Sequence, residues 1–193
     1  MWKRLFSSPL TWALAVVVVA GLIFGGYWFQ PWKLVTDQVV DESVPVVQGT
    51  DVSGPTPIPS ASASPSPTPR VSPSPAGNQL LAAGEFVTHE HETTGTAQVV
   101  QLADGRRQLV LRNFATSNGP DLRVWLSDQP VLEGRAGWFV FDDGEWFELD
   151  RLKGNQGNQV YDIPADVDLS ALTSVSIWCK RFSVSFGAAD LAA

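Results

Sequence analysis

The sequence predicts an all-β domain, an antiparallel β-sandwich or barrel-like fold of about eight strands, preceded by one transmembrane helix and a disordered linker. Three observations among the 193 residues indicate this order. An uncharged apolar run covers 10–29, a Pro/Ser-rich stretch without aromatic residues follows it, and apolar residues alternate with a period of two after residue 80. No window of 80–193 shows a sustained helical stripe, so this part is predicted to be one β domain.

Residues 10–29 are expected to cross a membrane as a helix. At about 1.5 Å per residue their length is roughly 30 Å, the thickness of a bilayer's hydrocarbon core. Lys3 and Arg4 precede the run, so the positive-inside rule places 1–9 in the cytoplasm and the rest of the chain outside the cell membrane. A cleaved signal peptide is the alternative, but the run is longer than a signal's apolar region and ends in the aromatic residues 27–29.

Residues 30–79 are predicted to form an extracytoplasmic, Pro/Ser-rich linker. Within it, 54–77 alternates Pro with small polar residues. Proline fixes φ and removes a backbone donor, and the segment carries too little apolar surface to fold. In polyproline II this stretch would reach roughly 75 Å, so we expect a spacer that holds the domain away from the membrane.

The remaining residues, 80–193, are predicted to be short strands separated by turns. Alternation starts in 87–101, and Asp104-Gly105 then gives a hairpin signal before RQLVLRNF. Further turn signals are 118–120, ahead of DLRVWLS, and 142–144, between WFVF and EWFEL. The last predicted strands are VYDIP, SVSIWC and FSVSF.

Charge and cysteine content exclude several functions. Residues 80–193 hold 16 acidic and 9 basic side chains, which accounts for the net charge of −7 and argues against a nucleic-acid partner. The single Cys excludes an internal disulfide, a zinc ribbon and an iron–sulfur cluster within one chain. No hydrolase or transferase motif is present, so whether the protein is an enzyme stays open.

Three motifs in the β domain carry a family resemblance: TSNGPDLRVWLS at 116–127, LKGNQGNQVYDIP at 152–164 and SVSIWCKRFSVSFGAADL at 174–191. Together with FVTHEHETTGTAQV at 86–99, they resemble the DM-thirteen domain, also described as the electron-transfer DM domain. The resemblance implies an extracytoplasmic β domain with a characteristic cysteine, here Cys179, and a redox or electron-transfer accessory role.

Cys179 is the candidate catalytic residue, as a redox thiol. By strand alternation it shares a face with Val175 and Ile177, which favours a buried and inert thiol. In the alternative, Lys180 and Arg181 stabilise a thiolate at an accessible sulfur. An unpaired thiol outside the cytoplasm is prone to oxidation unless it is hidden or used.

His89 and His91 are the candidate metal ligands. On a strand these two residues project to the same side, so both rings could reach one ion. Cys179 as a third ligand would favour copper, and imidazole also suits other transition metals. In the alternative reading both are surface histidines, and no cofactor binds.

Two functions remain open from the sequence. The leading one is a membrane-tethered extracytoplasmic domain with a redox or electron-transfer role through Cys179, acting with a redox partner. The alternative is a non-catalytic binding or adhesion module that recognises an envelope polymer or a partner protein through an aromatic and acidic face. Trp138 and Trp146 are expected in the core, and the Gly/Asn-rich loop 153–158 is expected to be a tight turn.

Overall fold

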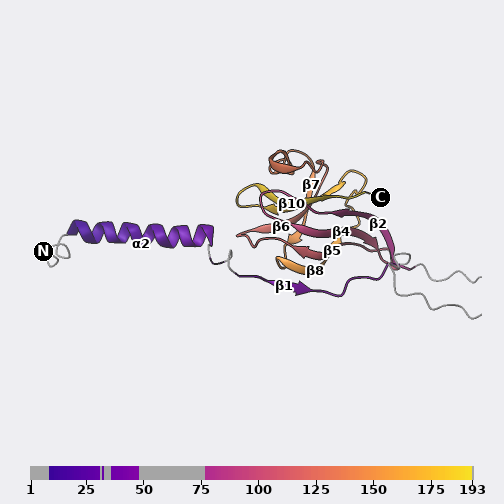
Figure 1. Ribbon diagram of the computed structural model, residues 1–193, viewed down its shortest axis with the longest axis horizontal. Coiled ribbons are helices and arrows are strands. Elements are labelled where there is room, and N and C mark those ends of the chain that lie inside the picture. The colour runs from indigo at the N-terminus through magenta and orange to yellow at the C-terminus, as the bar shows by residue number, and fades with distance from the viewer. Residues whose placement is uncertain (1–8, 31, 33–35, 48–76, 193) are drawn as a thin grey trace, which may run out of the picture.

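The computed structural model describes residues 9–30, 32, 36–47 and 77–192. One long helix extends away from one end of a β domain (Figure 1). Of the predicted cytoplasmic segment 1–9, only Pro9 is described. Residues 48–76, most of the predicted disordered linker, lie outside the described residues.

The predicted apolar helix is α2 (Pro9–Phe29). None of its side chains is buried, and it is long and apolar enough to cross a membrane. A helix that is apolar on every side needs an apolar environment around it, and the β domain does not supply one. α2 is therefore a candidate membrane span or signal sequence.

The predicted all-β class is confirmed, with two five-stranded sheets. The first sheet, in spatial order, contains β1 (Val39–Asp41), β8 (Gln156–Ile163), β5 (Arg107–Ala115), β4 (Thr94–Gln101) and β2 (Gln79–Glu85). The second contains β3 (Val87–Thr88), β10 (Val184–Asp190), β9 (Ser174–Cys179), β6 (Leu122–Ser127) and β7 (Trp146–Arg151). Neighbouring strands are antiparallel except for β1 and β8, which are parallel.

The main core lies between the two sheets. Period-two alternation places every second side chain of the inner strands there, as in a sandwich. Val99, Leu109 and Leu111 come from the first sheet, and Val124 and Ile177 from the second.

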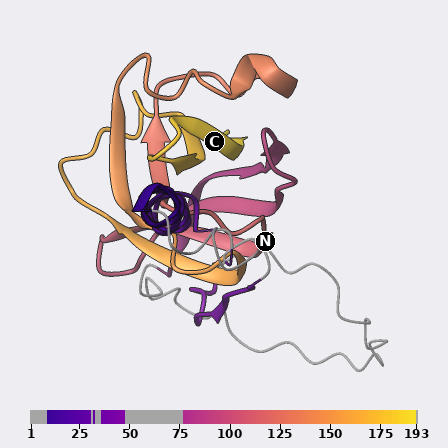
Figure 2. The same ribbon diagram turned by 90° about the vertical axis from the view of Figure 1, so that its left-hand side faces the viewer.

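A smaller aromatic cluster covers the outer face of the second sheet. It contains Trp125, Phe141 and Trp178, and Trp178 lies between Ile177 and Cys179 on the opposite side of β9. The segment between β6 and β7 includes the short 3-10 helix η2 (Gly134–Gly137), which lies at the periphery in the view along α2 (Figure 2). Because Ile177 and Cys179 pack in the main core and Trp178 packs in this cluster, strand β9 is buried on both faces.

Strand β1 lies in residues that the sequence analysis assigned to the linker. It adds to the first sheet by parallel pairing of Val39, Val40 and Asp41 with β8. Beyond β1, the Asn78 Nδ2 atom donates a hydrogen bond to the Val46 carbonyl at 2.9 Å, so the chain before residue 48 and the chain after residue 76 meet. Within the predicted linker, β1 therefore fixes residues 39–41 to the sheet. The Pro/Ser-rich stretch 54–77 lies outside the described residues apart from Gly77, and its role as a spacer stays a prediction.

The β domain has two distinct ends. Strand β9 runs to Cys179, which pairs with Leu122 at the start of β6. We call this the proximal end, because the turn after Cys179 contacts α2. Strand β6 runs away from it to Ser127, which pairs with Trp146 of β7, and we call that the distal end.

Candidate functional site

Cys179 lies at the proximal end with its side chain fully buried in the main core, at 0% exposure. Burial raises the pKa of its thiol, while hydrogen bonding from the backbone of Phe182, Arg181 and Asp121 acts to lower it. Burial is the larger effect, so the closed structure holds Cys179 as a neutral thiol. The negative charge of Asp121 acts in the same direction as burial and raises the pKa of the Cys179 thiol further.

The two cations predicted to stabilise a Cys179 thiolate form other interactions. Lys180 forms an ion pair with Glu148 at 3.1 Å. Arg181 donates hydrogen bonds to the carbonyl oxygens of Tyr27 and Trp28 at the end of α2. The turn that covers the thiol is thereby tied to β7 on one side and to α2 on the other.

His89 is buried and its ring is held on both nitrogens. Its Nδ1 lies 2.8 Å from the Ser185 hydroxyl, and its Nε2 lies 3.0 Å from the Leu132 carbonyl oxygen. A carbonyl oxygen only accepts, so Nε2 carries the proton and Nδ1 accepts from Ser185. Burial lowers the pKa of His89, and the hydrogen bond to Leu132 acts in the opposite direction. His89 is thus a neutral, structural histidine in this state.

His91 lies apart from this arrangement. Strand β3 ends at Thr88, so His89 and His91 lie on a bend rather than on the strand that the sequence analysis expected. The His91 ring packs on Phe186 with centroids 4.0 Å apart, and its Nε2 lies 2.6 Å from Glu90. Within the described residues, no three His, Cys, Asp or Glu side chains come together as a metal site.

These residues do not fit the predicted copper or other transition-metal site. Binding through His89 would require its ring to give up the bonds to Ser185 and Leu132 and to become exposed.

The Gly/Asn-rich segment 153–158 binds the β1 segment, a role that the sequence analysis missed. The predicted tight turn is wrong for residues 156–158, which begin strand β8. Asn155 accepts a hydrogen bond from the Gln38 backbone N–H at 2.6 Å and donates one to Asp37 at 2.9 Å. The Lys153 Nζ atom binds both carboxylate oxygens of Glu42 at 2.9 Å. We name Lys153, Gly154, Asn155, Gly157 and Asn158 the strand cradle.

The glycines of the strand cradle allow the backbone of β1 to approach closely. A Cβ atom on Gly157, whose φ is +104°, would lie 1.9 Å from the Val40 carbonyl oxygen. One on Gly154 would lie 2.3 Å from the Gln38 carbonyl oxygen. Two glycines beside an edge strand are a signal of close backbone approach, and this signal could have suggested the contact.

Charge supports the same docking. Burial raises the pKa of Glu42, but hydrogen bonds from Lys153 and Val160 outweigh it and hold that pKa below its usual value. Asn158 donates a further hydrogen bond to Asp41 at 2.8 Å. The strand cradle is therefore specific for an extended acidic segment, and 37–42 supplies it.

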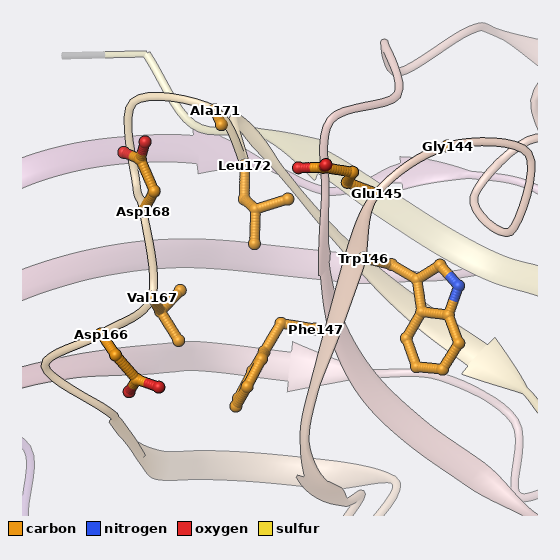
Figure 3. Close-up of a pocket in the computed structure, with 9 residues that line it drawn as sticks. All are labelled: Gly144, Glu145, Trp146, Phe147, Asp166, Val167, Asp168, Ala171 and Leu172. Carbon is orange, nitrogen blue, oxygen red and sulfur yellow. The ribbon is translucent and has the colours of Figure 1, made fainter.

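The distal end carries a separate pocket of about 470 Å³. Figure 3 shows Phe147, Val167 and Leu172 pointing into it, with the carboxyl groups of Asp166 and Asp168 at its rim. The indole of Trp146 lies on the other side of β7, 42% exposed and stacked on Trp125 at 4.0 Å. The pocket lining consists of Gly144, Glu145, Trp146, Phe147, Asp166, Val167, Asp168, Ala171 and Leu172.

A family model described as Electron transfer DM13 matches residues 85–191. The matched range includes Cys179, both histidines, the strand cradle and the distal pocket, while α2 and β1 lie before it. No curated protein and no solved structure matches the chain.

Proposed function

Because the chain belongs to the Electron transfer DM13 family, we propose that it is a membrane-tethered, extracytoplasmic electron-transfer accessory domain with Cys179 as its redox group. Membership of the family indicates an electron-transfer-related role. The observation that supports the finer proposal is the position of the thiol beneath the turn 180–182, where hydrogen bonding from the backbone of Asp121, Arg181 and Phe182 acts to lower its pKa.

The proposed chemistry needs the turn 180–182 to open. An exposed Cys179 thiolate attacks a hydroperoxide: an S–O bond forms, the O–O bond breaks, and the leaving alkoxide takes a proton to become an alcohol. The sulfur is thereby oxidised by two electrons to a sulfenic acid. A partner dithiol then reduces it, forming its own disulfide and releasing water, so two electrons pass from the dithiol to the peroxide.

The experiment is turnover of a dithiol and a hydroperoxide by the full-length protein in detergent. Dithiothreitol and cumene hydroperoxide serve as probes, and a sulfenic-acid trap identifies the oxidised residue. We expect peroxide consumption above background and trapping at Cys179. Equal consumption by Cys179→Ala, which keeps the site apolar, would overturn the proposal.

A second candidate function rests on the distal pocket. Two carboxylates, from Glu145 and Asp166, border an apolar floor, an arrangement suited to an amine-bearing envelope polymer or a basic segment of a partner protein. The test is tryptophan fluorescence during titration with a cationic polysaccharide. Binding that Asp166→Asn weakens and Cys179→Ala leaves unchanged would favour this function over the redox role.

A further inference from the structure

The docking of β1 keeps the β domain close to the end of α2. Only residues 30–38 connect α2 to β1, and fully extended they reach at most about 35 Å. If β1 were released, the connection would run from 30 to 78 and could reach about 160 Å. The strand cradle therefore sets how far the domain can lie from a membrane that α2 spans, and this inference rests on that proposed anchoring.

The end of α2 also contacts the β domain directly. Arg181 donates hydrogen bonds to the carbonyl oxygens of Tyr27 and Trp28, and its guanidinium lies 5.2 Å from the Trp28 ring centroid. The last turn of α2 contains no basic residue of its own. Arg181 thus supplies the positive charge that stabilises a helix C-terminus.

The depth of this contact in a bilayer follows from Phe29. It is the last residue of α2, and aromatic residues at the end of an apolar span lie at the level of the lipid headgroups. The Phe182 ring lies 6.0 Å from the Phe29 ring, in a stacked arrangement, and so lies at the same depth. Phe182 remains 43% exposed despite this contact, and it follows two cations in the chain.

We propose that the β9–β10 turn, Lys180 to Phe182, is a second membrane contact. Phe182 inserts at the boundary between headgroups and acyl chains, and Lys180 and Arg181 bind lipid phosphates. An apolar ring flanked by cations matches the chemistry of that boundary. The partner of this surface is the lipid bilayer that holds α2, and the turn that covers Cys179 is the part of the domain pressed against it.

The experiment uses the full chain in vesicles of phosphatidylcholine and phosphatidylglycerol. A nitroxide is attached at Phe182→Cys in a Cys179→Ala background, and a matched one at Ala103→Cys, in the exposed distal hairpin between β4 and β5. Collision rates with oxygen, which concentrates in lipid, and with a water-soluble nickel chelate report depth. We expect the oxygen-to-nickel ratio to be several-fold higher at 182 than at 103.

Equal ratios at the two positions, in protein that floats with the vesicles, would overturn the membrane contact and leave the anchor intact. Protein that does not float would overturn the anchor, and the contact with it. Lys180→Cys gives a second label on the same turn if Phe182→Cys fails to fold, because its side chain is half exposed and pairs only with Glu148 among the described residues.

Discussion

The two ends of the β domain differ in how their polar groups are used. At the proximal end, the amides and cations of the loop 153–158 and of the turn 180–182 bind other parts of the chain, namely 37–42 and α2. At the distal end, Asp166 and Glu145 border a pocket that is open among the residues the structure describes. The buried thiol lies at the first end and the pocket at the second.

This difference separates the two candidate functions in space. Cys179 and Ser174 stand at opposite ends of β9, and the pocket-lining segment 166–172 ends next to Ser174. A substitution at one end can therefore be made without contact with the other end. Substitutions at the proximal end are expected to change the docking of β1 and the redox chemistry of Cys179. Substitutions in the distal pocket are expected to change ligand binding alone.

The largest expected effect is the loss of β1 docking in Gly157→Ala. The positive φ and the clash with the Val40 carbonyl together should cost about 2–4 kcal/mol. Hydrogen exchange should show that the amides of 39–41 lose protection, and denaturant unfolding gives the change in free energy.

The matched control is Gly105→Ala in the distal β4–β5 hairpin. Gly105 also has a positive φ, +86°, but a Cβ atom there meets nothing within 4 Å. We expect a loss of about 1–2 kcal/mol from strain, with β1 still protected. Unchanged protection of 39–41 in Gly157→Ala would contradict the role given to the strand cradle.

A smaller effect is expected when the core thiol becomes a hydroxyl. Cys179→Ser should lower the free energy of unfolding by about 1–3 kcal/mol, because a hydroxyl is buried among apolar side chains. Cys179→Ala should cost less, since it adds no polar group to desolvate. Guanidinium unfolding of the two variants compares them directly, and a serine variant at least as stable as alanine would show that the sulfur is not in an apolar site.

Acidification should destabilise the fold through His89. The folded pKa of His89 lies below its ordinary value of 6.5, so the unfolded chain binds the proton more tightly. Its contribution to stability is fully present above pH 6.5 and is lost as the pH falls through the folded pKa. His89→Gln should flatten the dependence of unfolding free energy on pH in this range, measured by denaturant titration at several pH values. An unchanged slope in His89→Gln would contradict this assignment.

The smallest effect on stability is expected at the distal pocket. Asp166→Asn should change the unfolding free energy by no more than about 0.5 kcal/mol, because the side chain lies at the surface. A larger loss of unfolding free energy, measured by the same denaturant titration, would show that the Asp166 carboxylate stabilises the fold and is not free to bind a ligand.

Alternation predicted the fold class and the placement of Cys179. Val175, Ile177 and Cys179 do share the inner face of β9, and Trp178 faces outward, because a strand between two packed layers keeps its period of two along its whole length. The four motifs that carry the family resemblance, from 86–99 to 174–191, likewise lie within the matched range 85–191.

Contacts between segments far apart in the sequence were not predictable in the same way. Strand β1 is short and lies outside the alternating region. The strand cradle, more than a hundred residues later, binds the acidic side chains in and beside it, Asp37, Asp41 and Glu42. The ring of His89 is likewise held by Ser185 and Leu132, which lie far from it in the sequence. The redox role of Cys179 stays a prediction.

The most direct test of the account is the rate at which a maleimide labels Cys179 in the native full-length protein. We predict slow labelling that is faster than global unfolding, because opening the turn 180–182 suffices to expose the sulfur. Labelling that occurs only at the rate of global unfolding would contradict the account and leave the thiol as a packing group.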